Sequence, residues 1–137
     1  MDDQELLATA RAASEQAYVP YSHLRVGAVV VGEGGAVYTG ANVENAAYPS
    51  TMCAEAVAIG HAVASGERKL ESVAVVSPDL PVIVPCGNCR QLMAEFDVAR
   101  VILEGPTGDP DSHTMDEMLP GRFTDWRSAP GSASTST

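Results

Sequence analysis

Two helical segments that each connect one strand to the next constrain the fold of this chain more than any other feature. The runs from Cys53 to about Ala64 and from 86 to 96 both have helical length, and apolar stretches with the pattern of strands lie before and after each of them. A helix that links two strands in this way forms a crossover, so the linked strands should run parallel. The sequence therefore predicts an α/β layered domain with helices on the faces of a sheet.

The remaining elements fit the same domain. An amphipathic helix is predicted at 3–17, and a hairpin is predicted at 24–43 with its glycine-rich turn at 32–35. Apolar runs predict two further strands at 70–77 and 99–105. The expected order is helix, hairpin, helix, strand, helix, strand, in a mixed sheet.

Length, charge and the terminal segments restrict the classes of function. A chain of 137 residues favours one domain, and a net charge of −10 argues against a polyanionic or anionic-membrane partner, so a small neutral substrate fits better. The start MDDQELLATARAA has acidic residues where a secretory signal would be basic, and no segment reaches the roughly 20 apolar residues of a membrane helix. We therefore expect a cytoplasmic protein. The Ser/Ala/Gly/Thr-rich tail at 127–137 is expected to be disordered.

Three cysteines begin the two crossover helices, Cys53 at one and Cys86 with Cys89 at the other. In a reducing compartment such cysteines more often bind metal or react than form disulfides. A C-x2-C pair with a third cysteine at a neighbouring helix start indicates zinc. A structural zinc site takes four protein ligands, yet His61 lies about 12 Å along the helix from Cys53, and no fourth ligand is evident. The sequence therefore favours a catalytic zinc whose fourth coordination position is free for water. A structural zinc is the alternative.

Glu55 lies two residues after Cys53, close enough to reach a water molecule at that open position without binding the metal. Such a water needs a group that takes its proton and delivers it to the substrate. Burial and the excess negative charge of three thiolates should raise the pKa of Glu55, which suits this work near neutral pH. We interpret Glu55 as a proton shuttle.

The motifs CAE and PCGNCRQ resemble those of the zinc-dependent cytidine deaminases, whose signature is C/H-x-E followed by P-C-x-x-C. VPYSHLRVGAVVV, GANVENAAYP and EMLPGRF also occur in the order typical of the small members that act on free nucleosides, and the likeness covers about residues 5–126. The resemblance implies a three-layer α/β/α fold with a mixed, mainly five-stranded sheet. It further implies one catalytic domain at 1–126, homotetramers with pockets shared between subunits, and hydrolytic deamination of cytidine and 2′-deoxycytidine in pyrimidine salvage.

The resemblance also implies roles for individual residues. One Zn²⁺ per chain would be held by the three cysteines, Cys53, Cys86 and Cys89, while Glu55 moves the proton and zinc-activated water attacks C4 of cytosine. The ribose 3′-hydroxyl would be bound by Asn42 and Glu44 of the NVEN motif. Residues placed around the base or lent to a neighbouring subunit's pocket would be Leu24, the backbone of Ala54, Tyr48 and Phe123.

Two positions, Leu24 and Ala56, differ from the residues common in the family, and a third, Arg90, could compensate for one of these differences. Family members often carry Phe at the position of Leu24, so stacking on the base should be weaker here. Many members with three cysteine ligands carry Arg after the catalytic Glu, where this chain has Ala56. Arg90 could temper the thiolate charge instead, or it could form a structural salt bridge with a carboxylate.

Several other functions remain possible on the sequence alone. The nearest alternative is a deaminase of a modified or antibiotic aminonucleoside, such as the blasticidin-S-type relatives. Polynucleotide editing is disfavoured by charge and length, and guanine-type deaminases usually lack the sugar-binding motif. A non-catalytic zinc protein is a different class of hypothesis, and the presence of Glu55 argues against it.

Overall fold

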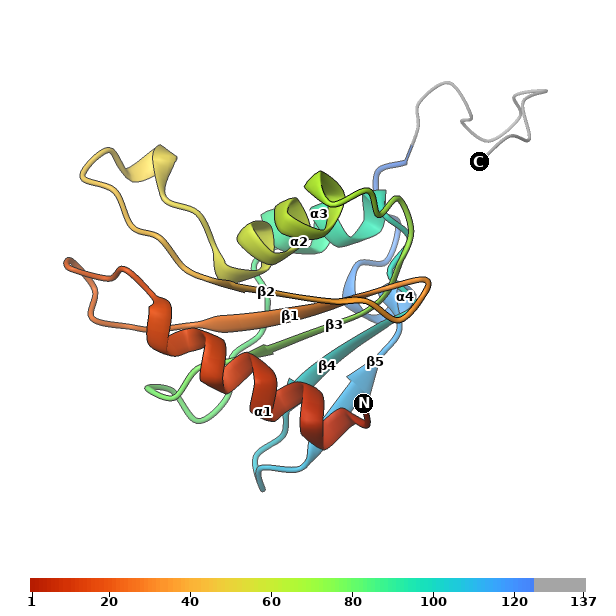
Figure 1. Cartoon of the computed structure of the whole chain (residues 1–137), viewed down its shortest axis with the longest axis horizontal. Helices are drawn as coiled ribbons and strands as arrows, with labels where there is room; N and C mark the ends of the chain where they lie inside the picture. Colours follow the sequence, from red (N-terminus) through yellow and green to blue (C-terminus); the bar gives the residue numbers. More distant parts are fainter. Residues whose placement is uncertain (125–137) are drawn as a thin grey trace.

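The computed structural model describes residues 1–124, and a five-stranded sheet in the order β2-β1-β3-β4-β5 forms its centre. The strands are β1 (Gly27–Gly32), β2 (Val37–Ala41), β3 (Leu70–Val76), β4 (Arg100–Glu104) and β5 (Pro110–His113). The helices are α1 (Asp3–Ala13), α2 (Ala54–Ala64), α3 (Gly87–Glu95) and the short α4 (Met115–Met118). Helix α1 covers one face of the sheet, and α2 and α3 cover the other (Figure 1). This is the expected three-layer α/β/α fold with a mixed five-stranded sheet.

The pairing of the strands refines the prediction of parallel crossovers. Strand β1 is antiparallel to both of its neighbours, β2 and β3, whereas β3 pairs parallel with β4. Both crossovers therefore join strands of the same direction, as predicted. However, β2 and β3 are not adjacent, because the hairpin places β1 between them and α2 crosses over it.

The functional end of the sheet is set by the register of β1. Gly27, the first residue of β1, pairs with Ala41 at the end of β2 and with Val76 at the end of β3. At this end of the strands, the chain leaves β2 and β3 and enters the connections that lead to α2 and α3. The segments 17–26 and 42–53 extend from the same end of the sheet (Figure 1).

Apolar side chains pack on both faces of the sheet. The face toward α1 buries one cluster, made of Leu6, Leu7, Ala10, Val29, Ala74, Val76 and Ile102. The other face buries a larger cluster with α2, α3 and α4, which includes Ala54, Ala58, Ile59, Val73, Val75, Cys89, Met93, Val101 and Met118. Since Cys89 and Ala54 belong to this cluster, the starts of α2 and α3 are fixed by core packing.

Glycine allows the helix α2 to lie directly against the sheet. A Cβ atom placed on Gly40 of β2 would lie 2.7 Å from the backbone oxygen of Ala54 and would overlap the backbone nitrogen of Ala58. Any larger residue would push α2, and the cysteine before it, away from the sheet.

Several elements differ from the prediction. Helix α1 ends at Ala13 and continues as a 3₁₀ turn, Ser14–Gln16, so the predicted helix at 3–17 is too long as an α-helix. The residue pattern located neither strand β5 nor helix α4, although the family resemblance implied a fifth strand. Within residues 1–124, no helix is long and apolar enough to cross a membrane. The tail predicted to be disordered, 127–137, lies outside the described residues.

Candidate active site

The three cysteines, predicted from separate parts of the chain, lie together. Their sulfur atoms are all within 4.8 Å of one another, with Cys89 buried, Cys53 half-buried and Cys86 exposed. All three are free thiols. Zinc with sulfur ligands at about 2.3 Å holds neighbouring sulfurs about 3.8 Å apart, so small side-chain movements would let this group bind one zinc ion. Thiolates are also the donors that zinc prefers, and the site therefore fits one Zn²⁺ per chain.

The two helices behind the cysteines lack ordinary N-caps. Cys53 is the N-cap of α2 and Cys86 is the N-cap of α3, and in the described chain neither side chain makes a capping hydrogen bond. By contrast, Asp2 caps α1 through a bond of 2.8 Å from the backbone nitrogen of Glu5. The positive ends of two helix dipoles are thus turned toward the thiols, where they favour ionised sulfur.

The thiols also affect one another electrostatically. Interaction with the Cys89 thiol lowers the pKa of Cys53 to about 6, although burial opposes this change. The same pairing with Cys53, together with burial, raises the pKa of Cys89 far above its ordinary value. The Cys53 thiolate is therefore available at neutral pH, and a bound cation would be needed to ionise Cys89 as well.

Glu55 lies in the first turn of α2 and is only 5% exposed. Burial raises the pKa of this carboxyl to about 7, and the charge of Cys53 adds to the increase. A carboxyl that titrates near neutral pH can both take up and release a proton under cellular conditions. This agrees with the environment expected from the sequence.

Arg90, the candidate for offsetting the thiolate charge, donates its hydrogen bonds to two backbone carbonyl groups. Arg90 donates from Nε to the carbonyl oxygen of Pro85 at 2.9 Å and from Nη1 to that of Met118 at 2.9 Å. It thereby joins the cysteine loop to α4, a role that neither sequence interpretation of Arg90 anticipated. Ala56 follows Glu55 with a side chain that carries no charge, and His61 contacts the carbonyl oxygen of Thr39 instead of the sulfur group.

Glu44 holds the segment that precedes β1. Its carboxylate accepts hydrogen bonds from the backbone N–H groups of Tyr21 (3.0 Å) and Ser22 (3.1 Å) and from the Ser22 hydroxyl. The bonds from Ser22 lower the pKa of Glu44, so it is a carboxylate at neutral pH. The turn needs this support, because His23 adopts a left-handed backbone conformation with φ of 60°.

Asn42 holds the next part of the same segment. Its side-chain oxygen accepts from the backbone nitrogen of Val26 at 2.9 Å, and its side-chain nitrogen donates to the carbonyl oxygen of Leu24 at 2.9 Å. Leu24 also donates from its backbone nitrogen to the Ser22 hydroxyl at 3.0 Å. The two residues of the NVEN motif therefore fix the backbone on both sides of Leu24.

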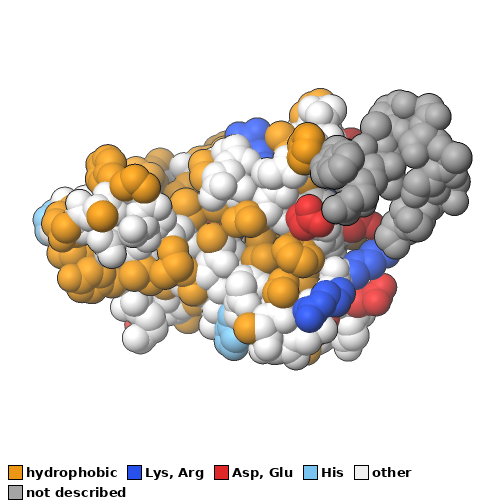
Figure 2. All heavy atoms as spheres, turned by 90° about the horizontal axis from the view of Figure 1, so that it is seen from above, with side chains coloured by type: hydrophobic (Ala, Val, Ile, Leu, Met, Phe, Trp, Pro, Cys, Tyr) orange, Lys and Arg blue, Asp and Glu red, His pale blue; other side chains and the backbone are white. Residues whose placement is uncertain are grey.

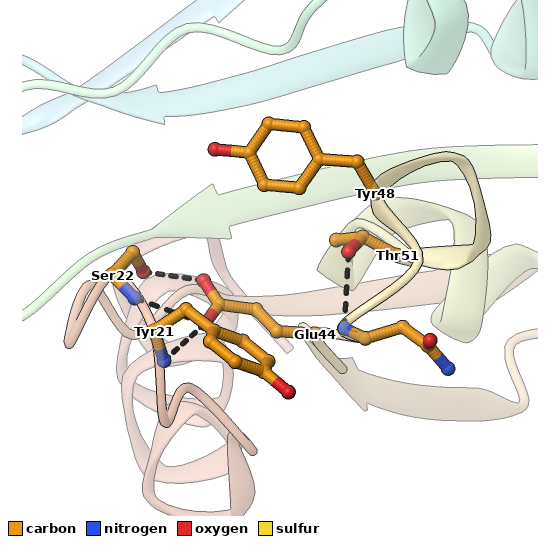
Figure 3. Close-up of a pocket in the computed structure, with 6 residues that line it drawn as sticks. Tyr21, Ser22, Glu44, Tyr48 and Thr51 are labelled. Carbon is orange, nitrogen blue, oxygen red and sulfur yellow. Dashed lines mark hydrogen bonds between the residues drawn. The ribbon is translucent and has the colours of Figure 1, made fainter.

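A cavity of about 330 Å³ opens beside Glu44 (Figure 3). Its lining consists of Tyr21, Ser22, Glu44, Asn45, Tyr48 and Thr51. Tyr21 and Ser22 lie on one side of the opening, and the ring of Tyr48 projects across from the other (Figure 3). Thr51 accepts a hydrogen bond from the backbone nitrogen of Asn45 at 3.1 Å, which fixes the turn that carries Tyr48.

The remaining predicted residues are distributed around these two centres. Ala54 is buried between Cys53 and Glu55, and Leu24 is 41% exposed. Tyr48 and Phe123 are 85% and 68% exposed, and the carbonyl oxygen of Phe123 accepts from Gln91 at 2.9 Å. The described chain brings Glu44 and Tyr48 to one cavity, while Phe123 lies outside its lining.

The sequence analysis missed Tyr21, Ser22, Asn45 and Thr51 as cavity residues, and it missed an ion pair between Arg25 and Asp79. The first four lie in or beside the motifs already quoted, so position in the sequence could have suggested them. Asp79 lies in a Pro-rich connection whose side chains carry no periodic signal.

Comparison with known proteins agrees with this geometry. A family model described as the cytidine and deoxycytidylate deaminase zinc-binding region matches residues 1–104. A cytidine deaminase of Sporosarcina psychrophila is 44% identical over 126 residues, which cover 90% of this chain and 93% of that protein. A cytidine deaminase of Halalkalibacterium halodurans is 45% identical, over 90% of this chain and 96% of that protein.

Solved structures show the same likeness. The crystal structure of cytidine deaminase from Burkholderia pseudomallei has a TM-score of 0.83 and 40% identity, covering 90% of this chain and all of that chain. That of cytidine deaminase from Mycobacterium tuberculosis has a TM-score of 0.78 and 35% identity, covering 90% and 98%. The range that the family model matches contains the three cysteines and all the residues that line the cavity.

Proposed function

This chain belongs to the zinc-dependent cytidine deaminase family, and we propose that it converts cytidine and 2′-deoxycytidine, with water, to uridine and 2′-deoxyuridine and ammonia. The observation that carries the proposal is the group of three cysteine sulfurs beside a buried carboxyl that titrates near neutral pH. The enzyme is thus a hydrolase of a cyclic amidine C–N bond. We take residues 1–126 as its single catalytic domain.

We assign the metal to Cys53, Cys86 and Cys89. When bound there, zinc supplies Lewis-acid activation of a water molecule. The cysteines hold the metal at the starts of α2 and α3, and the core packing of Cys89 keeps its position fixed. Zinc content of the purified protein should be about one per chain and should fall on replacement of any of the three cysteines by alanine.

Glu55 is the residue that moves the proton. Hydrolysis at C4 of the pyrimidine requires that a proton from water reach the departing amino nitrogen, and a carboxyl with a pKa of about 7 can accept it and release it again. Burial also excludes bulk water from the carboxyl, so the proton is passed to the substrate rather than lost.

We assign the ribose 3′-hydroxyl to Asn42 and Glu44. A carboxylate offers about four acceptor sites and the Glu44 carboxylate uses three, while Asn42 uses one of its two side-chain N–H donors. One acceptor and one donor remain, which is what a hydroxyl requires. A substrate without the hydroxyl leaves both unpaired, so 3′-deoxycytidine should be a far poorer substrate than cytidine. Equal rates would contradict this assignment.

The negative charge of Glu44 also favours a nucleoside over a nucleotide. The cavity lining contains this carboxylate and no lysine or arginine among the described residues. A 5′-phosphate brought near it would be repelled and would have no cationic partner. We therefore expect cytidine to be turned over much faster than CMP.

Leu24 and the backbone of Ala54 are assigned to the base, and Tyr48 and Phe123 to the pocket of a neighbouring subunit in a homotetramer. Large apolar side chains are exposed in the described chain and support such an assembly, namely Tyr18, Tyr21, Leu24, Tyr48, Met52, Leu80, Val82, Val84 and Phe123. Hydrophobic side chains gather at the end of the molecule where the segments 17–26 and 42–53 extend from the sheet (Figure 2). Light scattering should give the mass of four chains, and a monomer with full activity would contradict the shared pocket.

We further propose that the enzyme acts in the cytoplasm in pyrimidine salvage. Its three free thiols need a reducing compartment to stay available for metal. A spectrophotometric and ammonia-release screen over cytidine, deoxycytidine, cytosine, CMP and a blasticidin-type nucleoside tests the substrate directly. Preference for the last would favour the modified-nucleoside alternative, and no turnover of any of them would contradict the proposed function.

A further inference from the structure

We propose that Asp79 is a positioning residue for the substrate pocket, acting through Arg25 on the backbone that presents Leu24 and Asn42. This inference rests on the proposed function, since Leu24 and Asn42 are the residues assigned to base and ribose. Asp79 belongs to the connection between β3 and α3, which ends at Cys86.

Asp79 binds both the backbone and the side chain of Arg25. Oδ2 accepts from the Arg25 backbone nitrogen at 2.8 Å and from Nε at 3.1 Å, and Oδ1 accepts from Nη2 at 2.9 Å. The Arg25 guanidinium lowers the pKa of Asp79 to about 2, so the pair stays ionised over the working range of the protein. Two of these three bonds need the arginine side chain, and the third needs only its peptide N–H.

Ser77 completes the attachment from the same side. Its hydroxyl donates to the carbonyl oxygen of Arg25 at 2.7 Å and accepts from the backbone nitrogen of Asp79 at 3.1 Å. Ser77 is only 3% exposed, so these bonds are shielded from water. Both peptide groups of Arg25 are therefore held, and we call Arg25, Ser77 and Asp79 with these bonds the Arg25 clamp.

The Arg25 clamp and the side chain of Asn42 together take the place of part of a β-sheet ladder. Residues 24–26 precede Gly27, whose partners Ala41 and Val76 are the last residues of β2 and β3. In a strand, successive peptide groups point to alternate neighbours. Here the carbonyl of Leu24 and both peptide groups of Val26 point to Asn42, whereas those of Arg25 point to Asp79 and Ser77. One backbone bond remains, from the Asn42 nitrogen to the Val26 carbonyl oxygen at 3.2 Å, and side chains continue the pairing beyond it.

This arrangement determines how the pocket is presented. Leu24 lies between the left-handed turn at His23 and Arg25, and the Arg25 clamp fixes the residue that directly follows it. The amide of Asn42 is oriented by the same short segment. Loss of the Arg25 clamp should therefore misplace a base contact and a ribose contact together, while the sulfur group and Glu55 on α2 and α3 keep their core packing.

The geometry predicts an asymmetry between the two partners. Asp79→Ala removes all three bonds, whereas Arg25→Ala leaves the bond to the backbone nitrogen in place. Asp79→Ala should raise KM for cytidine and the inhibition constant of uridine in parallel, by about tenfold, with kcat within about twofold of the native value. Arg25→Ala should raise both constants by less. Asp79→Asn, which keeps an acceptor oxygen, should lie between the native enzyme and Asp79→Ala.

A matched control is available on the far side of the sheet. Asp3 of α1 forms a similar two-bond pair with Arg100, with both distances 3.0 Å. Asp3→Ala should lower thermal stability without changing KM. If Asp79→Ala and Asp3→Ala leave KM equally unchanged, or if Arg25→Ala is as damaging as Asp79→Ala, the positioning role is wrong.

A measurement without substrate separates this inference from the proposed function. Amide hydrogen exchange should show that Asp79→Ala increases exchange at Arg25 and Leu24, with the amides of α2 and α3 unchanged. Unchanged exchange at these two residues would overturn the Arg25 clamp whatever the substrate is. If the native protein failed to deaminate cytidine while the exchange result held, the proposed function would fall and the Arg25 clamp would stand as a structural feature only.

Discussion

Replacement of Glu55 by glutamine should make the protein more stable and inactive at the same time. The side chain is 5% exposed, and burial raises its pKa from 4.5 to about 7. Since one pH unit of pKa difference corresponds to about 1.4 kcal/mol, keeping Glu55 ionised inside the fold costs about 3 kcal/mol. Glutamine has the same shape and no charge, so Glu55→Gln removes this cost.

The pH dependence of this effect has a definite sign. The pKa is higher in the folded state than in the unfolded state, so the folded protein binds more protons between pH 4.5 and about 7. The cost is therefore absent at pH values below 4.5, grows as pH rises through this window, and is complete above it. The variant should exceed the native protein by about 3 kcal/mol at pH 8 and by less than about 1 kcal/mol at pH 5.

Urea unfolding of both proteins at pH 5 and pH 8 measures this difference. Zinc is removed by chelation beforehand, because a cation beside Glu55 would itself lower the pKa of the carboxyl. In the zinc-loaded proteins, the substitution should lower kcat by about 10²- to 10⁴-fold with the zinc content unchanged. Equal free energies of unfolding at pH 8 would refute the reasoning about burial, and kcat within a few-fold of native would refute the proton shuttle.

Three further substitutions test how the site is supported. Gly40→Ala should cost about 1–3 kcal/mol of stability and reduce zinc content, because the added Cβ would meet the backbone of α2. Gly34→Ala, with open space around it in the described structure, should change neither quantity. Thermal melts measure the stability and metal analysis measures the zinc content of both variants. Leu24→Phe should lower KM for cytidine by about 2- to 10-fold through stacking on the base, and an unchanged KM would remove Leu24 from the base site. Met93→Ala, at a fully buried position on α3, should cost about 2–5 kcal/mol in denaturant unfolding, and a loss below about 1 kcal/mol would contradict its place in the core.

The order of the main elements could be predicted because their local signals agree with the packing. The alternating and continuous apolar runs of β1, β3 and β4 are buried where the pattern indicated, and both crossover helices begin within one residue of the predicted start. Strand β5 was missed because it lies at the edge of the sheet, begins with Pro110 and exposes polar residues, so it has no hydrophobic pattern. Helix α4 did carry a signal, the capping box of Thr114 and Glu117, in a segment too short for periodicity.

The chemical centre could be predicted further than the substrate pocket. Cysteines at two neighbouring helix starts in a reducing compartment indicate metal binding, and the layered topology alone brings such starts together. The support of the pocket could not be read in the same way. The bonds from Asp79 and Ser77 to Arg25 join segments more than fifty residues apart, and they depend on where two strands happen to end. These contacts can be identified only once the pairing of the strands is known.

The missing N-caps of α2 and α3 give the metal a part in folding as well as in chemistry. An absent cap costs a helix about 1 kcal/mol, and here two helices that pack on the same core go without one. Zinc held by Cys53 and Cys86 would keep both side chains ionised, and their negative charge would then stabilise the helix ends that a serine or aspartate normally covers. The stability of the chain then depends on the free zinc concentration, increasing by about 1.4 kcal/mol for each tenfold excess over the dissociation constant. A cell short of zinc would therefore hold fewer folded molecules of this enzyme, in addition to fewer active ones.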